Sequence, residues 1–437
     1  MLLGTFWIGL YLLLASGPLA IAFFGDPPQA RSFWIEFSVA LGFIGLAMIA
    51  LQFVITARID HINGPYGIDV IYRFHRHISI VAFLLILAHP LILFLAEPAE
   101  YLPLLAVWDA PARAVMAWAA LLGLVAIVVS SIWRIRLGLS YEAWRVLHGI
   151  LAIIILALAL GHALGVGHYL AQFWQQALWI AMGGLVVLVT TYVRLIKPFL
   201  MKRRPWQVAN VTPERGNCWT LELEPRGHRG IRFRPGQFAW ITVGPSVWMV
   251  QEHPFSFSTS AERTDRVGFT TKENGDFTNQ IGRIAPGTEA YLDGPHGVFT
   301  IDRRPGVEGA VYIAGGIGIT PMMSMLRTLA DRGDQRPHLL IYANQDWESV
   351  TFRDELPQLE QRLNLRTVHV LQKPPDQWQG ETGMINAPLL DRHLPQRRGH
   401  HEHYICGPAP MITAAHQALA QVGVPLERIE SEEFVLV

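Results

Sequence analysis

The chain has 437 residues, no net charge at pH 7 and 51% hydrophobic residues, but only 16% of its residues are charged. Globular proteins have about 25% charged residues. The shortage lies at the start of the chain, because 18 of the first 200 residues are charged, against 52 of the remaining 237. The balanced charge and short basic runs argue against a nucleic-acid partner, and two distant cysteines exclude a disulfide scaffold.

Six apolar stretches predict membrane-spanning helices, because a spanning helix needs about 20 largely apolar residues. They cover roughly residues 2–24, 33–57, 72–96, 113–133, 145–166 and 172–195. The first stretch could also be read as a signal peptide, but no Lys or Arg precedes its apolar run, which favours a retained helix. The sequence therefore predicts a multi-pass protein of the cell membrane, surrounded by membrane lipid.

Charges between the stretches predict their orientation. Arginines flank the connections after the second, fourth and sixth stretches, whereas the other connections carry mainly Asp26, Glu97, Glu100 and Asp109. By the positive-inside rule, the N-terminus and the whole C-terminal half are expected in the cytoplasm.

Beyond residue 200 the pattern changes to short alternating runs broken by Gly and Pro. Runs such as Phe238–Val243, Val267–Thr271 and Glu289–Leu292 predict a small antiparallel β-barrel over about 205–303.

Over 307–437, apolar strands such as Ala310–Ala314 and Leu339–Ala343 alternate with helical stretches, which is typical of an α/β domain with a parallel sheet. The predicted fold is therefore multidomain: a six-helix transmembrane bundle over 1–200, then the barrel, then the α/β domain.

Two predicted membrane helices carry histidines at matched spacing. His75 and His89 lie on the third stretch, and His148 and His162 on the fifth. Each pair is 14 residues apart, close to four turns, so its members share a face about 21 Å apart. Both helices enter from the same side, so His75 faces His148 at one level and His89 faces His162 at the other. Two imidazoles at each level are the ligand set of a six-coordinate haem b.

Other readings of these polar residues remain open. A single membrane histidine more often bonds a neighbouring helix, but matched spacing on two helices favours haem. His77 lies about 120° off the shared face, His168 lies past the helix end and His61 in a loop. Three arginines are candidates to pair with haem propionates, or are simple topology signals: Arg73, Arg76 and Arg145.

Two haems between the third and fifth helices resemble the transmembrane domain of the ferric reductase and NADPH oxidase superfamily. A haem iron accepts one electron and a hydride carries two, so a haem chain fed by nicotinamide needs a converter such as flavin. The matching candidate segments are Arg234-Pro235-Gly236-Gln237-Phe238 and His253-Pro254-Phe255-Ser256-Phe257-Ser258, which are similar to the flavin signature of the superfamily's reductase-like domain.

The resemblance implies a role for each flavin residue. Phe255 is expected against the isoalloxazine, Ser256 near its N5 and His253 beside the polar tail of FAD. The segment Gly275-Asp276-Phe277-Thr278, after Lys272, matches the one that offers backbone N–H groups and a hydroxyl to the pyrophosphate. Either motif alone is compatible with an ordinary strand and turn.

A glycine-rich turn is the candidate nucleotide site. It reads Ala314-Gly315-Gly316-Ile317-Gly318-Ile319-Thr320-Pro321, between an apolar strand and the amphipathic run Met322–Leu329. Its glycines let the backbone approach a phosphate at the helix N-terminus. Pro321 takes the last place of a GxGxxG motif, and the turn instead resembles that of the reductase-like NAD(P)H domain. A generic strand-to-helix turn is the alternative.

Two features near the C-terminus agree with this resemblance. Cys406-Gly407-Pro408 resembles the strand end at which a thiol sits beside the nicotinamide, although a lone cysteine is more often buried filler. Phe434 corresponds to the terminal aromatic that covers the flavin, or is a core strand residue. Ser256, Cys406 and Phe434 are thus the residues expected at the reacting ring.

These features predict an NAD(P)H-dependent flavocytochrome b oxidoreductase. Electrons are expected to pass from NADH or NADPH to FAD, then through two haems b to an extracytoplasmic acceptor. The segment Asn344-Gln345-Asp346 has no Arg before Arg353, which predicts use of NADH at least as good as that of NADPH, unless Arg327 or Arg332 swings in.

The acceptor is ranked as ferric iron first and oxygen second. NADPH oxidases place a further histidine one turn after the outer ligand, where this chain has Leu93. Arg31 and His168 could fill that role, and the acidic loop residues attract cations modestly. An ion-coupled transporter with a nucleotide-sensing domain, its histidines acting as a proton relay, is the alternative of another class.

Overall fold

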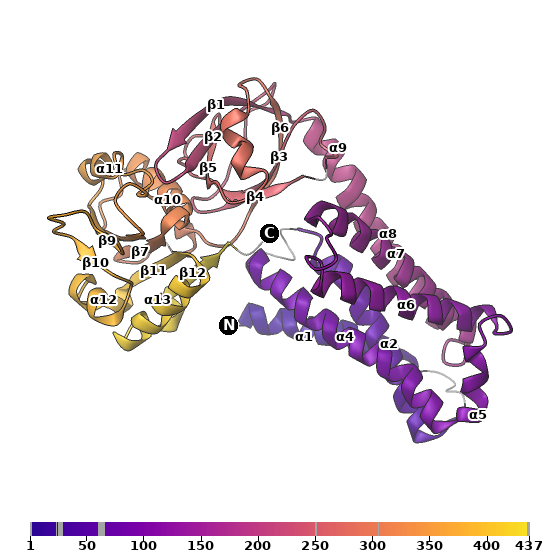
Figure 1. Ribbon diagram of the computed structural model, residues 1–437. Coiled ribbons are helices and arrows are strands. Elements are labelled where there is room, and N and C mark those ends of the chain that lie inside the picture. Colours follow the sequence, from indigo (N-terminus) through magenta and orange to yellow (C-terminus); the bar gives the residue numbers. More distant parts are fainter. Residues whose placement is uncertain are drawn as a thin grey trace. The chain divides into compact units, whose positions relative to one another are not determined.

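The computed structural model describes residues 2–22, 24, 29–59, 66–249, 251–304 and 306–434. The contacts divide the chain into two compact units, Met1–Lys197 and Pro198–Val437. Figure 1 labels the elements of both units. Asp26 and His61 of the sequence predictions lie outside the described residues.

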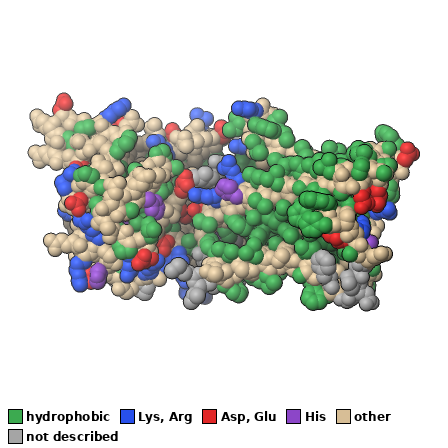
Figure 2. Space-filling model, turned by 90° about the horizontal axis from the view of Figure 1, so that it is seen from below, with side chains coloured by type: hydrophobic (Ala, Val, Ile, Leu, Met, Phe, Trp, Pro, Cys, Tyr) green, Lys and Arg blue, Asp and Glu red, His purple; other side chains and the backbone are tan. Residues whose placement is uncertain are grey.

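The described part of the first unit contains the six long apolar helices that the sequence predicts. They are α1 (Leu2–Ala22), α2 (Phe33–Ile55), α4 (Ile68–Ala96), α6 (Ala112–Ile132), α7 (Tyr141–Val166) and α8 (Phe173–Thr191), with the short α5 (Pro98–Tyr101) and η1 (Leu102–Leu105) after α4. Each long helix has the length and composition to cross a membrane. Hydrophobic side chains cover much of this unit's surface in Figure 2, as a bilayer requires.

Small residues let these helices approach one another in pairs. A Cβ at Gly45 of α2 would lie 2.6 Å from Ile86 Cγ1 of α4, and one at Gly123 of α6 would lie 2.9 Å from Ile155 Cγ1 of α7. Small side chains are common where helices cross in membrane bundles, because in lipid there is no hydrophobic driving force for helix association and close packing takes its place. The α2–α4 and α6–α7 pairs position the paired histidines.

The last membrane helix runs on beyond its apolar stretch. A π-helical turn, η2 (Tyr192–Ile196), joins α8 to α9 (Lys197–Lys202). Pro198 lacks an N–H group and its ring crowds the carbonyl four residues earlier, so a wider turn accommodates it. The chain therefore enters the second unit on a helix.

An antiparallel sheet begins the second unit. Its described strands are β1 (Trp206–Glu214), β2 (Cys218–Pro225), β3 (Phe238–Val243), β4 (His253–Ser256), β5 (Val267–Lys272) and β6 (Glu289–His296), in the order β4-β3-β6-β1-β2-β5. A bridge between Phe257 and Phe269 joins the two ends of that order. The sheet therefore curls into a partly closed barrel around apolar side chains such as Leu223, as the sequence predicts.

A parallel sheet completes the second unit. Its described strands are β7 (Gly309–Gly315), β8 (His338–Asn344), β9 (Leu365–Leu371), β10 (Glu381–Thr382), β11 (His401–Gly407) and β12 (Ile429–Glu433), in the order β10-β9-β8-β7-β11-β12. The helices are α10 (Ile319–Asp331), α11 (Leu356–Arg362), α12 (Ala387–His393) and α13 (Ala409–Gln421). Separate apolar clusters fill the two faces of the sheet, which confirms the predicted α/β architecture.

Helix α10 binds the barrel along one polar stripe at i, i+4 spacing. Thr320 Oγ1 donates to the Thr270 carbonyl at 3.1 Å, and Ser324 Oγ donates to the Thr259 carbonyl at 2.8 Å. Farther along, Thr328 Oγ1 accepts from the Ala261 N–H at 2.8 Å. Residues four apart share a helix face, so the barrel and the parallel sheet pack as one compact unit.

Candidate functional site

The four membrane histidines form the two pairs that their spacing indicates. The ring centroids of His75 and His148 lie 6.3 Å apart, and those of His89 and His162 lie 6.5 Å apart. His77 instead places Nδ1 2.7 Å from the Arg73 carbonyl of its own helix. Helix α4 thus presents one histidine of each pair toward α7.

The pair His75 and His148 is called the inner pair because it lies at the end of the bundle from which the chain leaves for the second unit, and it is anchored through Nδ1. His75 Nδ1 lies 2.7 Å from Gln52 Oε1, while Gln52 Nε2 donates to the Met48 carbonyl at 3.1 Å. Because the amide NH₂ is engaged, the amide oxygen faces the ring and fixes the proton on Nδ1. The contact from His148 Nδ1 to Ser131 Oγ is longer, at 3.5 Å.

The outer pair, His89 and His162, shares this arrangement. His89 Nδ1 lies 2.9 Å from the Ser38 carbonyl, and His162 Nδ1 lies 2.8 Å from the Arg113 carbonyl. A carbonyl can only accept, so each Nδ1 carries the proton and the lone pair stays on Nε2. Nε2 is therefore the nitrogen that remains to bind a metal ion at both levels.

The inner level lies at the end of the bundle from which the chain leaves for the second unit. A Cβ at Gly149, next to His148, would lie 3.4 Å from Arg194 Nη2 in the turn after α8. His89 and His162 lie about 14 residues, or roughly 21 Å, farther along α4 and α7.

A polar cluster lies at the opposite end of the bundle. Glu36 accepts hydrogen bonds from the Tyr169 hydroxyl and, at 2.9 Å, from the Arg31 N–H. The Arg31 guanidinium lies 5.5 Å from the Tyr169 ring centroid, and the His168 ring lies 4.7 Å from it. Among the described residues, Arg31 Nε and His168 Nε2 are buried without a hydrogen-bond partner.

Sequence reasoning named Arg31 and His168 but missed Glu36 and Tyr169. A signal for Glu36 was available, because it is the one charged residue inside the second apolar stretch. Gly167, with φ of 68°, ends α7 and places His168 beyond the helix, as predicted.

The predicted flavin segments meet through a stack of rings. The His253 ring lies 4.2 Å from that of Phe277 at an angle of 14°, and the Phe255 ring lies 6.0 Å from Phe277. On the same strand, Ser256 is 4% exposed and its hydroxyl has no hydrogen-bond partner among the described residues. An orphaned buried hydroxyl fits a strand that binds a polar ligand.

The loop before β3 and the turn after β5 are held by their own side chains. Gln237 Oε1 accepts from the Arg234 N–H at 2.8 Å, and Gln237 Nε2 donates to the Gly297 carbonyl at 3.0 Å. Thr278 Oγ1 accepts from the Asn274 N–H at 2.9 Å. The Thr278 hydroxyl therefore orders the predicted pyrophosphate turn from within.

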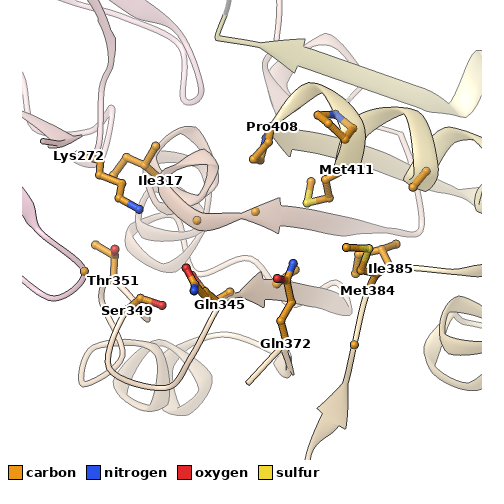
Figure 3. A pocket seen from close by; sticks show the side chains of 18 of the residues that line it. Lys272, Ile317, Gln345, Ser349, Thr351, Gln372, Met384, Ile385, Pro408 and Met411 are labelled. Carbon is orange, nitrogen blue, oxygen red and sulfur yellow. The ribbon is translucent and has the colours of Figure 1, made fainter. Parts of the chain in front are cut away.

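A cavity of about 320 Å³ opens at the carboxyl ends of β7, β8 and β11. Ligands of open α/β sheets bind at this edge. Figure 3 shows Lys272 entering from one side, Gln345 and Gln372 lining a wall, and Met411 reaching in from α13. Further lining residues are Gly315, Gly316, Ile317, Asn344, Ser349, Thr351, Met384, Ile385 and Pro408.

The glycine-rich turn forms part of this cavity. Gly316 has φ of 52°, which favours glycine, and a Cβ at Gly318 would clash with the Cys406 backbone. Thr320 and Pro321 follow in the first turn of α10, where backbone N–H groups suit a phosphate.

The structure places Cys406 and Phe434 in different surroundings. Cys406 is fully buried, and burial raises the pKa of its thiol, which stays protonated at neutral pH. Gly407 follows it at the end of β11. Phe434 is 47% exposed just past β12, unlike a core strand residue.

Lys272, which the sequence predicts as a cofactor-binding residue near the flavin pyrophosphate, lines the nucleotide cavity. Cys218 and Thr351, which the sequence did not indicate as site residues, line it as well. Cys218 pairs with Lys272 across β2 and β5, so the register of the barrel brings both there. Asn344 adds a buried amide nitrogen without a partner among the described residues.

Two arginines considered for a 2′-phosphate are engaged elsewhere. Arg327 Nε donates to Glu355 at 2.8 Å. Arg332 donates to Glu262 and to Asp302, at 2.6 Å each. Neither lines the cavity.

Fold and sites together define a class of protein: a multi-pass membrane bundle followed by a barrel and an α/β nucleotide domain. Models of known protein families match all three parts in order. Residues 41–159 match the ferric reductase like transmembrane component, 202–294 an FAD-binding domain and 312–417 an oxidoreductase NAD-binding domain. The chain therefore has the domain architecture of the ferric reductase and NADPH oxidase superfamily.

Individual relatives match part of the chain. An NADH-cytochrome b5 reductase 1 of Lodderomyces elongisporus is 32% identical over 173 residues, 38% of this chain and 57% of that protein. A flavohemoprotein of Deinococcus radiodurans is 30% identical over 245 residues, 53% of this chain and 59% of that protein. The chain thus spans a little over half the length of these curated relatives.

One solved structure is similar over most of the chain. A flavohemoglobin from Malassezia yamatoensis with bound FAD and heme superposes with a TM-score of 0.50 and 17% identity, covering 92% of this chain and 99% of that one. At this identity the similarity concerns the fold alone.

Proposed function

We propose that the chain is a transmembrane flavocytochrome b oxidoreductase. It passes electrons from NADH or NADPH through FAD and two haems b to an acceptor across the membrane. The observation that carries this proposal is the pair of histidine levels, in which acceptor groups hold the proton on Nδ1 of His75, His89 and His162. A proton relay does not require the same nitrogen to be held at both levels.

The ring separations fit a metal ion between the members of each pair. An imidazole nitrogen binds a metal at about 2.0–2.1 Å and lies about 1.1 Å from its ring centre, so two imidazoles that bind one ion from opposite sides would have centres about 6.3 Å apart. The observed separations are 6.3 and 6.5 Å. His75 with His148 and His89 with His162 would therefore hold the two haem irons.

The second unit would bind the flavin and the nucleotide. When bound, FAD accepts a hydride and supplies single electrons, which haem iron requires. Phe255 and Phe434 offer aromatic surface to its ring, and the buried Ser256 hydroxyl offers a hydrogen bond. Lys272 and the turn at Gly315 would orient the nucleotide phosphates.

NADH is expected to serve at least as well as NADPH. The cavity wall near the end of β8 offers the neutral Gln345 and Ser349, and Arg327 and Arg332 are held by carboxylates. The 2′-phosphate of NADPH would therefore form no hydrogen bond to an arginine at that wall, among the described residues.

Ferric iron is the first candidate acceptor, because a chelate needs only to approach the outer haem edge. Oxygen is the second candidate, favoured by Arg31 Nε and His168 Nε2 at the outer end, which are buried without a hydrogen-bond partner in the described part of the chain. The positive-inside rule supports a cytoplasmic second unit. Reconstituted protein supplied with NADH distinguishes the two, since superoxide release that ferric chelates fail to suppress favours oxygen.

Loss of one inner ligand tests the proposal. His75→Ala should remove the inner haem and stop transfer from NADH to the outer one, because one imidazole cannot complete six-coordination. His77→Ala, two residues away, is the matched control and should retain both haems. Pyridine haemochrome absorbance gives the haem content per chain. Two haems after His75→Ala would refute this ligand set, and a colourless wild-type protein would favour the transporter alternative.

A further inference from the structure

Exposed apolar side chains in the second unit gather at one place. Among its described residues, the large hydrophobic side chains left most exposed are Phe199, Leu200, Trp248, Met384, Leu426 and Phe434. Three of these, Phe199, Leu200 and Trp248, belong to α9 and to the turn that precedes β4. Such clustering marks an interaction surface rather than the scatter normal for a soluble face.

Basic side chains lie over these rings. Lys202 Nζ is 5.5 Å from the Trp248 ring centroid, and the Arg203 guanidinium is 4.7 Å from that of Phe199. We call Phe199, Leu200, Lys202, Arg203 and Trp248 the basic-aromatic patch. Its two segments, far apart in sequence, therefore form one continuous surface.

The turn that carries Trp248 is ordered by local hydrogen bonds. Ser246 Oγ accepts from the Trp248 N–H at 3.3 Å, and the Ser246 carbonyl accepts from the Met249 N–H at 3.2 Å. Val247 is buried, whereas Trp248 stays 49% exposed. The turn thus holds a large apolar ring outward, which is unfavourable in water.

The basic side chains of the patch lie in a part of the sequence without acidic neighbours, whereas the acidic residue nearest Trp248 in sequence is Glu252. Within the described residues, Lys202, Arg203 and Arg204 make no ion pair, and the sequence has no Asp or Glu between Glu142 and Glu214. Phe199, Leu200 and Lys202 form the last turn of the candidate membrane span Phe173–Lys202, and Arg203 follows it. Tryptophan beside Lys and Arg at this position is the composition of a membrane–water interface, where anionic lipids attract basic groups.

We propose that the basic-aromatic patch docks on anionic phospholipid headgroups of the leaflet from which α8 leaves the bilayer. Trp248 would sit at headgroup level, with Lys202 and Arg203 on lipid phosphates. The Trp248 turn leads within five residues into β4, which carries His253 and Phe255. Docking at Trp248 would therefore hold this turn at the headgroups five residues before the predicted flavin strand. The proposal needs only a bilayer and does not rest on electron transfer.

A spin label beside Trp248 tests the docking. The full chain with Pro245→Cys is labelled with a nitroxide and placed in nanodiscs of phosphatidylcholine, with or without phosphatidylglycerol. The native cysteines, Cys218 and Cys406, are 2% and 0% exposed and stay unlabelled. With phosphatidylglycerol, the collision rate of the label with a water-soluble nickel complex should fall several-fold, and its collision rate with oxygen should rise. Added salt should reverse both changes.

Variants separate lipid docking from other contacts. Trp248→Ser should return the label to water, and Lys202→Gln or Arg203→Gln should each weaken docking about fivefold. Leu426→Ser, which removes an even more exposed apolar side chain elsewhere on the unit (71% against 49% for Trp248), is the control and should change nothing. A label whose exposure ignores lipid charge and salt would overturn the proposal. Haem and flavin absorbance of the same samples reports separately on the proposed function.

Discussion

Each paired histidine depends on a partner that a sequence pattern does not reveal. The 14-residue spacing predicts that His75 and His89 share a face, and the structure shows them there. That Gln52 and Ser38 on α2 hold their Nδ1 atoms depends on which face of α2 meets α4. No periodicity within one helix contains that information.

Gln52 is expected to tune the inner haem specifically. Gln52→Leu removes the acceptor for His75 Nδ1–H, so the ring loses its fixed tautomer and part of its basicity. Haem affinity at that level should fall about 10–100-fold. In the protein that still binds the inner haem, the midpoint potential of that haem should rise. A redox titration resolves the two haems, of which one should change.

Gln176→Leu is the matched control for Gln52→Leu. Gln176 is a second membrane-unit glutamine, and its amide donates to the Leu170 carbonyl at 2.8 Å instead of to a paired histidine. Equal shifts of both potentials, or a shift in the control, would show that Gln52 acts only through packing.

Helix ends show where apolar patterns stop being informative. The third stretch predicts a helix from residue 72, but α4 begins at Ile68, and α7 begins at Tyr141 rather than 145. An apolar window ends where the bilayer ends, whereas backbone hydrogen bonding continues into water. Ser140 Oγ, which accepts from the Ala143 N–H at 3.2 Å, shows the actual start of α7.

The polar stripe of α10 should contribute measurably to stability. Thr328→Val removes the hydroxyl that accepts from the buried Ala261 N–H while keeping the side-chain volume. An unsatisfied buried N–H costs about 1–3 kcal/mol, so the second unit should melt several degrees lower in scanning calorimetry of the full chain.

Thr413→Val on α13 is the control for this loss. Its exposed hydroxyl donates to the Ala409 carbonyl of its own helix at 3.0 Å, and its removal should leave the transition unchanged. A similar melting temperature for Thr328→Val and wild type would mean that water satisfies Ala261.

At the scale of the molecule, the sequence predicts each architecture but not how the soluble parts associate. Barrel and parallel sheet follow from alternating and continuous apolar runs, such as Phe238–Val243 and Ala310–Ala314. Their union depends on hydroxyls of α10 that meet backbone groups of the barrel. A hydrophobicity pattern predicts that Ser and Thr lie at the surface, so this association was not predictable from the sequence.

Buried histidines should make the second unit sensitive to acid. Burial lowers the pKa of His338 and of His403 to about 4, against about 6.5 in an unfolded chain. Both are neutral in the fold, so their stabilising contribution is complete above pH 6.5 and is lost as pH falls toward 4. Unfolding free energy should therefore decrease across that window.

His403→Leu should flatten this dependence. Leucine does not titrate, so the variant lacks the contribution of this buried ring to the pH dependence. Denaturant melts at pH 7 and pH 5 should differ less in the variant, by up to ~2 kcal/mol. An unchanged difference would assign the acid sensitivity to other groups.

The equal intervals on α4 and α7 also constrain how this chain tolerates insertions. One extra residue between His75 and His89 turns one of them by about 100° and moves it about 1.5 Å along the axis, so it no longer faces its partner. A change in α4 alone is therefore incompatible with both pairs. Seven residues added to both helices would keep each face, and would lengthen the gap between levels by about two turns. The spacing of the two histidines and the face on which they lie must therefore change together on α4 and α7 if both pairs are to be kept.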